Sequence, residues 1–428
     1  MSSAMERVLI LATVISIARF TVPADAAGVD VAVRWTFRNP TASPSARAGS
    51  AAAPDSSDGN VVLFGGYDGG DLGDTWTWDG TSWTRRTPAT SPSARDAASI
   101  ANDPHSGHVV LFGGQVVTPR QHLQDTWIWG GTTWTPLSLT TKPLARAAAA
   151  MASDPASGRI VLFGGEATDR AILIDTWTFD GSSWTLQHPS VSPPPREKAA
   201  MATDPTTGHV VLFGGSDANG VLLGDTWTWD GSNWAHQSPL TSPTRREGAT
   251  MATDAASGHV VLFGGSGPNG SLLAGTWTWD GTNWAKAFPP TSPMPRRFPA
   301  MASDPAGRLV LFGGVQADNA SFLNDLWSLT PSLTIYPSSG PSGTVVNVRG
   351  FGYAPGSTIN VVKYRTSQAP PPQGPYGALC SASVAGDTTF ACSGAIPTGD
   401  LAGAPGRHDI VAKDSTGLKS ATTFNLTG

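Results

Sequence analysis

A net charge of only −5 on 428 residues, with 27 Lys and Arg against 32 Asp and Glu, excludes the concentrated basic surface typical of proteins that bind nucleic acid. An apolar fraction of 39%, including 16 Trp, excludes a disordered chain and allows a sizeable core. The 49 Gly and 35 Pro indicate short strands joined by tight turns. We therefore expect a folded all-β protein without a nucleic-acid partner.

The N-terminus has the layout of a secretory signal peptide. Arg7 precedes an apolar run over residues 8–18, and a small-residue site, Ala24-Asp25-Ala26, follows. The apolar run is too short to span a bilayer comfortably, although an uncleaved anchor or a misassigned start codon stays an alternative. We predict a signal peptide over residues 1–27. The mature chain would then be secreted or extracellular at the cell surface, without a membrane span.

The motif Phe-Gly-Gly recurs six times, at intervals of about 50 residues. Each copy contains an Arg, a run of small residues, a turn, an apolar run ending in Gly-Gly, a variable stretch and a Trp-rich segment. In the copy over residues 196–235 we expect strands at 198–203, 209–213, 226–229 and 233–235. Four strands in a period near 50 are typical of a β-propeller blade. The motif begins at Phe64, Phe112, Phe163, Phe213, Phe263 and Phe312.

The N-terminal segment is predicted to complete the last blade. The sixth copy lacks the final Trp, with Leu329 and Thr334 at the expected Trp positions. Trp35 precedes Arg47 at the spacing at which Trp234 precedes Arg246, although no Phe-Gly-Gly precedes Trp35. Residues 29–35 alternate apolar with polar or small residues, as a strand does. Their pairing into the sixth blade would close the ring and remove the exposed sheet edges.

Residues 29–330 resemble kelch repeats in the Gly-Gly after an apolar strand, the aromatic pair, the terminal Trp and the Pro-x-Arg before the next blade. The resemblance implies the six-bladed fold of kelch proteins and of the galactose oxidase propeller. The copper site of galactose oxidase needs two Tyr, one of them linked to Cys, and two His. The propeller here has only Tyr67 and no Cys, so that activity is not supported. We expect no metal and no cofactor; a calcium ion among Asp68, Asp71 and Asp74 stays an open alternative.

Residues 332–428 form a separate segment of alternating strands with Pro-Ser-Gly and Ala-Pro-Gly turns. The stretch Gly-Phe-Gly-x-Ala-Pro-Gly resembles bacterial immunoglobulin-like or IPT/TIG domains, which implies a small β-sandwich. The predicted domains are therefore the signal peptide at 1–27, the propeller at 28–331 and the sandwich at 332–428.

Both cysteines, Cys380 and Cys392, lie in this last segment. A hairpin turning at Gly386-Asp387 would place them opposite each other on neighbouring strands. We predict one disulfide, which indicates an oxidising compartment.

Two repeated residue types are predicted to be structural. The Met at one position of the innermost strands is expected to fill the core, and the repeated Arg is expected to hold the connection between blades through backbone hydrogen bonds. The alternative role for these Arg residues is the binding of an anionic ligand. The Met residues are Met151, Met201, Met251 and Met301, and the Arg residues are Arg47, Arg95, Arg146, Arg196, Arg246 and Arg296.

The candidate binding residues follow the repeated Arg, where the pattern changes from blade to blade. If strands alternate in direction, these residues share one face with the variable connections between second and third strands. They could line an asymmetric pocket over the axis, or simply a solvated rim. The candidates are Asp96, Glu197, Lys198, Glu247, Arg297 and Phe298.

These patterns favour an exported, non-catalytic binding or adhesion module that recognises a glycan or an extracellular protein through the variable loops. The alternative is a carbohydrate-active enzyme of epimerase or lyase type, with charged residues at the axial mouth. A purely structural surface protein is a third interpretation. Carboxylates with shifted pKa values around one pocket would favour the enzyme, and a flat face would favour binding.

Overall fold

The computed structural model describes residues 33–254, 258–289, 291–317, 320–336, 339–351, 358–366, 379–383, 390–396, 406–414 and 419–427. These residues form β-strands and one short 3-10 turn, Pro268–Gly270. The predicted signal peptide lies outside them. No helix in the described ranges is long and apolar enough to cross a membrane.

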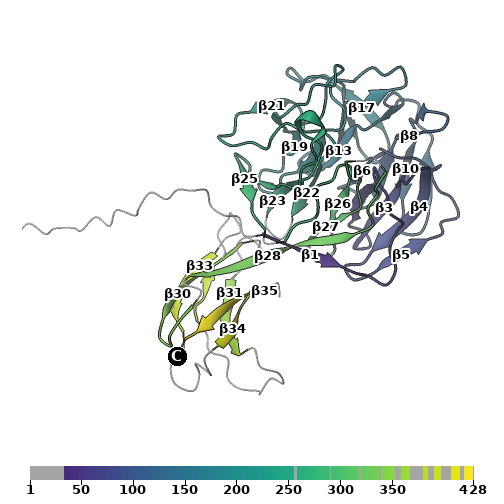
Figure 1. The fold of residues 1–428 in the computed structure, drawn as a ribbon. Coiled ribbons are helices and arrows are strands. Elements are labelled where there is room, and N and C mark those ends of the chain that lie inside the picture. Colours follow the sequence, from purple (N-terminus) through teal and green to yellow (C-terminus); the bar gives the residue numbers. More distant parts are fainter. Residues whose placement is uncertain are drawn as a thin grey trace, which may run out of the picture.

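The propeller has six blades, each an antiparallel four-stranded sheet (Figure 1). From the innermost strand outwards the blades are as follows. Blade 1 is β2 (Ala51–Asp55), β3 (Asn60–Tyr67), β4 (Asp71–Trp78) and β5 (Trp83–Arg86); blade 2 is β6 (Ser99–Asn102), β7 (Val109–Phe112), β10 (Thr126–Trp129) and β11 (Trp134–Leu137); blade 3 is β13 (Ala150–Asp154), β14 (Arg159–Phe163), β16 (Thr176–Phe179) and β17 (Trp184–Gln187). Blade 4 is β18 (Ala200–Thr203), β19 (Val210–Phe213), β20 (Thr226–Trp229) and β21 (Trp234–Gln237); blade 5 is β22 (Thr250–Asp254), β23 (His259–Phe263), β24 (Thr276–Trp279) and β25 (Trp284–Ala287). Short additional strands lie in the loops of blades 2 and 3. In blade 2, β8 (Gln115–Val116) pairs with β9 (Gln121–His122), and in blade 3, β12 (Arg146–Ala147) pairs with β15 (Glu166–Ala167).

Blade 6 consists of β26 (Ala300–Ser303), β27 (Leu309–Phe312), the first part of β28 (Leu326–Tyr336) and the N-terminal strand β1 (Val33–Arg38). Strand β1 pairs with β28 over its whole length, with Trp35 opposite Leu329. The predicted closure of the ring by the N-terminal segment is thus confirmed, with a strand that extends three residues beyond Trp35.

The blades are held together by a repeated contact between neighbours. Trp234 of blade 4 packs edge-on against Phe163 of blade 3 at a ring distance of 5.4 Å, and its Nε1 donates to Oγ1 of Thr176 at 2.9 Å. At the closure, Trp35 makes the same pair of contacts with Phe263 at 5.5 Å and Thr276 at 2.9 Å. Because each Trp fills the gap between two sheets, the strands around it are apolar on both faces, as in β19.

The Phe-Gly-Gly motif allows a close approach of backbones between blades. The second glycine, Gly215, donates its amide to the carbonyl of Arg246 at 2.9 Å. The first, Gly214, has a φ of 69°, and a Cβ there would lie 2.6 Å from the same carbonyl oxygen. Glycine is therefore required by contact as well as by backbone conformation.

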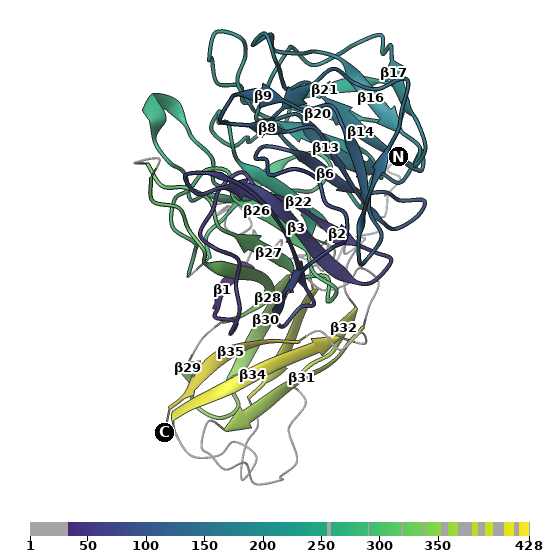
Figure 2. The same cartoon turned by 90° about the vertical axis from the view of Figure 1, so that its right-hand side faces the viewer.

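The C-terminal strands extend the sheet of blade 6 and form one further sheet (Figure 2). The extension continues from β28 through β30 (Val345–Phe351) to β33 (Phe390–Ala395). The further sheet contains β29 (Ser339–Gly340), β35 (Lys419–Leu426), β34 (Gly406–Asp414), β31 (Thr358–Thr366) and β32 (Ala382–Ser383). The single strand β28 crosses the predicted domain boundary at residues 331–332. The immunoglobulin-like sandwich stays a prediction.

The predicted disulfide between Cys380 and Cys392 is present, with a Cα–Cα distance of 5.9 Å. The predicted hairpin setting is wrong. Cys380 lies just before β32, which pairs with β31, whereas Cys392 lies in β33, which pairs with β30. The bond therefore links two different sheets. The proposed turn at Gly386-Asp387 lies outside the described residues.

Candidate functional site

The variable loops and the residues that follow the repeated Arg lie on one face of the propeller, which we call the loop face. In every blade the residue after this Arg pairs, antiparallel, with the residue that follows Gly-Gly. The predicted grouping of these segments is therefore confirmed. The pairs are Ala48 with Tyr67, Asp96 with Gln115, Ala147 with Glu166, Glu197 with Ser216, Glu247 with Ser266 and Arg297 with Val315.

The repeated Arg residues are buried and hold the loop face together, as predicted. Arg196 donates from Nη1 to the carbonyl of Gly214, and its Nη1 and Nη2 each lie 2.8 Å from one carboxylate oxygen of Asp225. Asp225 also accepts a 2.7 Å hydrogen bond from Nε1 of Trp227. Such two-pronged pairs are strong and strictly oriented. The equivalent pairs are Arg47 with Asp74, Arg95 with Asp125, Arg146 with Asp175 and Arg296 with Asp325; blade 5 differs, because Gly275 stands where the Asp is expected.

A closed ring of backbone hydrogen bonds surrounds the axis at the loop face. The residue two positions after each Arg has a positive φ, between 49° and 65°. Its amide donates to the carbonyl of the equivalent residue in the preceding blade, at 2.7 to 3.0 Å, and the bond from Gly49 to Phe298 completes the circle. We call these residues the axial ring: Gly49, Ala97, Ala148, Lys198, Gly248 and Phe298.

A pocket of about 320 Å³ is lined by five of the six axial ring residues and by the residues beside them. The loops of blades 1, 2, 3 and 6 supply its other walls. The loops over 216–224 and 266–274, from blades 4 and 5, contribute no lining residue. The loop side chains in the wall are Tyr67, Gln115, Arg120, Glu166, Val315 and Phe322.

Lys198 joins two carboxylates at one side of the pocket. Its Nζ lies 2.8 Å from Oε1 of Glu197 and 3.5 Å from Oε2 of Glu247. Burial acts to lower the pKa of Lys198, but these two carboxylates raise it overall. Glu247 also accepts a 2.6 Å hydrogen bond from Oγ of Ser216. The ammonium group therefore stays charged and keeps both carboxylates in place.

Asp96 is a carboxyl group suited to proton transfer. Burial, reinforced by the negative charge of Asp71, raises the pKa of Asp96 to about 6, although Gln115 and Arg120 partly oppose the shift. A carboxyl with a pKa near 6 can accept or donate a proton close to neutral pH. It is one of the lining residues of the pocket.

A second charged cluster lies in the walls from blades 2 and 3. Nη2 of Arg120 is 2.5 Å from Oε2 of Glu166, and Nε2 of the buried His122 is 3.8 Å from the same oxygen. Burial lowers the pKa of His122 and outweighs the opposing effect of Glu166. The imidazole is therefore neutral at pH 7, and Arg120 is the cation that orients Glu166.

Aromatic rings supply the apolar part of the pocket. The guanidinium of Arg297 lies 5.3 Å from the ring centre of Phe298, a cation–π arrangement. Phe298 packs over Gly248, where an added Cβ would lie only 2.6 Å from the ring. Tyr67 and Phe322 form an edge-on pair at 5.9 Å. Glycine at 248 thus leaves the space that the Phe298 ring occupies.

Of the six predicted binding residues, the structure brings five into the pocket wall: Asp96, Glu197, Lys198, Arg297 and Phe298. Glu247 does not line the pocket but contacts it through Lys198. The sequence predicts recognition by the variable loops as a whole but singles out none of their residues in the pocket wall, such as Arg120 and Glu166. For Glu166 the signal is that the position after Gly-Gly varies among the blades, although Ser216 and Ser266 are alike.

Two of the three Asp residues considered for calcium make other contacts. Asp74 is held by Arg47 and by Nε1 of Trp76, and Asp71 accepts the amide of Val117 at 2.9 Å. Within the described ranges no group of three or more His, Cys, Asp or Glu could hold a metal ion. The repeated Met residues are buried in the cores between blades, as predicted, and line an axial cavity of about 140 Å³.

Comparison with known proteins supports the fold. No protein-family model and no curated protein matches the chain. Among solved structures, one described as the structure of YjhT has a TM-score of 0.54 and 16% identity, over 69% of this chain and 96% of that chain. A fungal alcohol oxidase of the AA5 family, in complex with copper, has a TM-score of 0.45 and 13% identity, over 93% of this chain and 100% of that chain. The chain thus has the fold of a six-bladed β-propeller.

Proposed function

We propose that this protein is an exported, non-catalytic binding module. It holds one sugar residue of a glycan in the pocket of about 320 Å³ on the loop face. The observation that carries the proposal is the convergence of carboxylates, cations and aromatic rings in one pocket of about 320 Å³. This volume lies at the small end of the range for ligand sites, roughly 300 to 1,000 Å³. It suits a monosaccharide unit rather than a long polymer segment.

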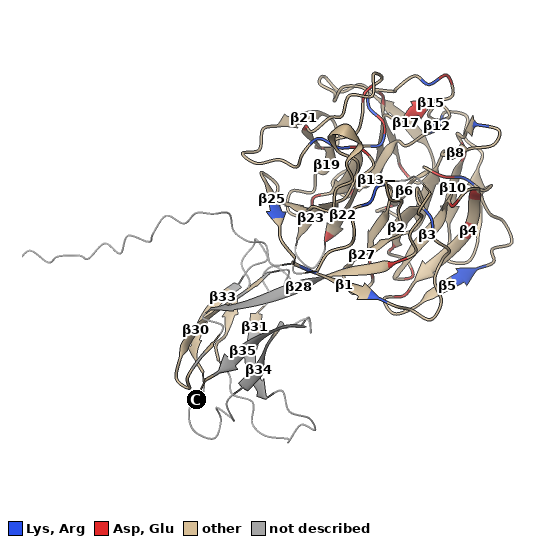
Figure 3. Ribbon diagram, in the orientation of Figure 1, with Lys and Arg blue, Asp and Glu red and all other residues tan. Residues whose placement is uncertain are grey.

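The chemistry of the wall suits a sugar. Carboxylates, the amide of Gln115 and the ammonium of Lys198 can exchange hydrogen bonds with hydroxyl groups. The rings of Tyr67 and Phe298 can pack against C–H faces. Acidic and basic side chains both occur in the wall, and Figure 3 shows the two kinds interspersed over the propeller ribbon. The mixed charge favours a neutral sugar over a polyanion.

A concave pocket also argues against a protein partner as the main ligand. Stable protein–protein interfaces bury roughly 800 Å² on each partner, mostly across broad surfaces. The disulfide indicates an oxidising environment, and together with the predicted signal peptide it supports the export that we propose.

The experiment is a titration of the chain, residues 28–428, with monosaccharides and short oligosaccharides, followed by saturation-transfer NMR and calorimetry. Lys198→Met and Phe298→Ala should each weaken binding about tenfold or more, the loss expected when a charged hydrogen bond or an aromatic contact is removed. Lys286→Met is the matched control, because Lys286 is exposed on the outer strand β25, away from the pocket. Thermal unfolding checks that each variant is folded. Binding unchanged in both pocket variants would contradict the proposal.

A second candidate function follows from the criterion that shifted carboxylates around one concave pocket favour an enzyme. The pocket and the raised pKa of one lining carboxyl group, that of Asp96, meet this criterion in part. A carboxyl group that changes its protonation near pH 6 inside a polar pocket could move a proton at a bound sugar, as an epimerase or a lyase requires. Incubation of the bound sugar with the protein in deuterium oxide tests this. Deuterium incorporation that disappears in Asp96→Asn would favour the enzyme, and its absence would favour binding alone.

A further inference from the structure

Blade 5 departs from the other five blades at a single buried contact. Wherever the repeated Arg is 27 to 30 residues ahead of an Asp, the two side chains form a two-pronged ion pair. The position 29 residues after Arg246 is Gly275, which has no side chain. Blade 5 therefore keeps the Arg that binds a carboxylate in the other blades, but it lacks the Asp side chain that supplies that carboxylate.

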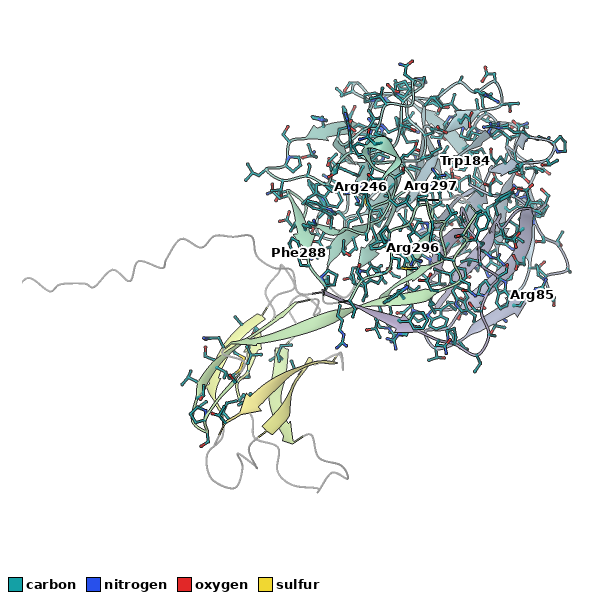
Figure 4. The ribbon with its side chains drawn as sticks, viewed as in Figure 1. Arg85, Trp184, Arg246, Phe288, Arg296 and Arg297 are labelled. Atoms are coloured by element: carbon teal, nitrogen blue, oxygen red, sulfur yellow. A yellow bond between two sulfur atoms is a disulfide. The ribbon has the colours of Figure 1, made fainter. Side chains whose placement is uncertain are left out.

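The guanidinium of Arg246 is nevertheless held as in the other blades. Its Nη1 donates to the carbonyl of Gly264 and its Nε to the carbonyl of Thr244, each at 2.9 Å. The same two contacts fix Arg196 on Gly214 and Pro194. Nη2 of Arg246 has no hydrogen-bond partner in the part of the chain that the structure describes. Arg246 is labelled in the propeller in Figure 4.

The second donor for this carboxylate is also present and unused. In the other blades the first Trp of the third strand donates its indole Nε1 to this Asp. In blade 4, for example, Trp227 donates to Asp225 at 2.7 Å. In blade 5 this residue is Trp277, and no acceptor for its Nε1 occurs among the described residues. A Cβ placed on Gly275 would lie 3.1 Å from Nε1 of Trp277. The indole therefore borders the space that an Asp side chain would fill.

Burial without a counter-charge is unfavourable for the guanidinium. Arg246 is only 3% exposed, and desolvation, with no carboxylate to oppose it, lowers its pKa to about 10. A buried charge is normally compensated by an ion or a partner. Solvent can reach the vacant position, since the five Asp side chains at the equivalent positions are 16% to 37% exposed.

We propose that blade 5 binds a small carboxylate anion, of the size of formate or acetate, between the guanidinium of Arg246 and the indole N–H of Trp277. The anion takes the place of the Asp carboxylate in the other blades and accepts hydrogen bonds from the same donors. The methyl group of acetate would lie near the Cβ position, close to Trp277, so formate fits with less movement. With only three heavy atoms, formate should bind no tighter than on the order of 1 mM.

The test combines thermal unfolding with NMR of the protein labelled with ¹⁵N at Trp. Sodium formate should raise the unfolding temperature of the wild type in a saturable manner, because a ligand that binds only the folded state stabilises it. It should also shift the indole N–H resonance of Trp277, assigned with Trp277→Phe. Sodium chloride at equal ionic strength is the comparison. An equal response to chloride would overturn the assignment to a carboxylate.

Two variants of Gly275 separate ligand binding from general salt effects. Gly275 has no positive φ, so an ordinary side chain is compatible with its backbone. Gly275→Asp should raise the unfolding temperature without formate, by roughly 2 to 4 °C, and should no longer respond to formate. Gly275→Asn fills the space without a charge and should lose the formate response without that gain. A Trp277 resonance that formate does not move in the wild type, or a formate response that persists in Gly275→Asp, would overturn the proposal.

Discussion

The amide nitrogen of Gly49 lies 3.0 Å from the carbonyl oxygen of Phe298, and this hydrogen bond joins the first blade to the sixth. The two residues are far apart in the sequence but occupy the same position of the repeat. Their contact completes the axial ring, which forms part of the lining of the candidate pocket. The integrity of the pocket therefore depends on closure of the propeller.

Removal of the Trp35 side chain should weaken the closure of the propeller by β1. Trp35 is fully buried, packs against Phe263 and donates to Thr276. Trp35→Ala should lower the free energy of unfolding by about 3 to 5 kcal/mol, the cost of a large cavity in a packed core. Chemical denaturation measures the change. Trp134→Ala, the equivalent in blade 2, is the control and should cost as much; a much smaller loss for Trp35→Ala would contradict a closing role for β1.

The inter-blade hydrogen bond of the Trp residues should contribute measurably to stability. Thr126→Val leaves Nε1 of the buried Trp184 without its acceptor at 3.0 Å and should cost about 1 to 3 kcal/mol. Thr126→Ser keeps the hydroxyl and should retain most of this stability. Thermal unfolding of both variants distinguishes the lost hydrogen bond from the lost methyl group. Equal effects of Val and Ser would show that the hydrogen bond does not matter.

Backbone strain in the axial ring should be relieved by glycine. Ala148 has a φ of 54°, a conformation that costs an L-residue about 1 kcal/mol and costs glycine little. Ala148→Gly should therefore raise the free energy of unfolding by about 0.5 to 1 kcal/mol. The control is Ala150→Gly in the regular strand β13, which should lower it. Destabilisation of similar size at both positions would refute the assignment of strain.

The stability of the protein should depend on the ionisation of Asp96. Its pKa rises from 3.8 to about 6 on folding, so the folded state binds the proton more tightly than the unfolded state. Stability is then lost as the pH rises from about 4 to 6, and the loss is complete at pH 7. Asp96→Asn should raise the free energy of unfolding by up to about 2 kcal/mol at pH 7 and by little at pH 3.5. The value at pH 7 is smaller than the full pKa shift would give, because solvent partly screens the Asp96 side chain.

Asp79 provides a comparison of opposite sign. Although slight burial opposes it, hydrogen bonds from Thr81 and Ser82 lower the pKa of Asp79 to about 2. The stabilising effect of Asp79 should therefore be present above pH 4 and disappear as the pH falls towards 2. Denaturant titrations of Asp96→Asn and Asp79→Asn between pH 2 and 7 check both signs. A pH-independent effect of Asp96→Asn would contradict its raised pKa.

Much of the architecture could be predicted from the sequence because the repeat is local and periodic. The strands of blade 4 lie within two residues of their predicted bounds, and Trp35 could be placed by its spacing to Arg47. Five of the predicted binding residues lie in one pocket, because a position next to an invariant Arg has the same place in every blade.

Other features depend on contacts between segments that are distant in the sequence. Five hydrogen bonds of the axial ring join residues about 50 positions apart, and the sixth joins Gly49 with Phe298; no composition signal marks Ala148 or Lys198 as left-handed. The salt bridge of Arg120 with Glu166 connects the variable loops of two different blades, which lie about 50 residues apart in the sequence. The sheet partners of the two cysteines likewise could not be read from their spacing.

The sequence by itself thus determined the number of blades, their strands, the closing segment and the face that varies, since these depend on residue types at fixed intervals. The tertiary structure alone decided which variable residues meet, that their pocket is built from the loops of four blades, and that Arg246 faces an empty position. The physical reason is that pockets and ion pairs depend on distances of a few ångströms between loops, which a linear pattern does not encode.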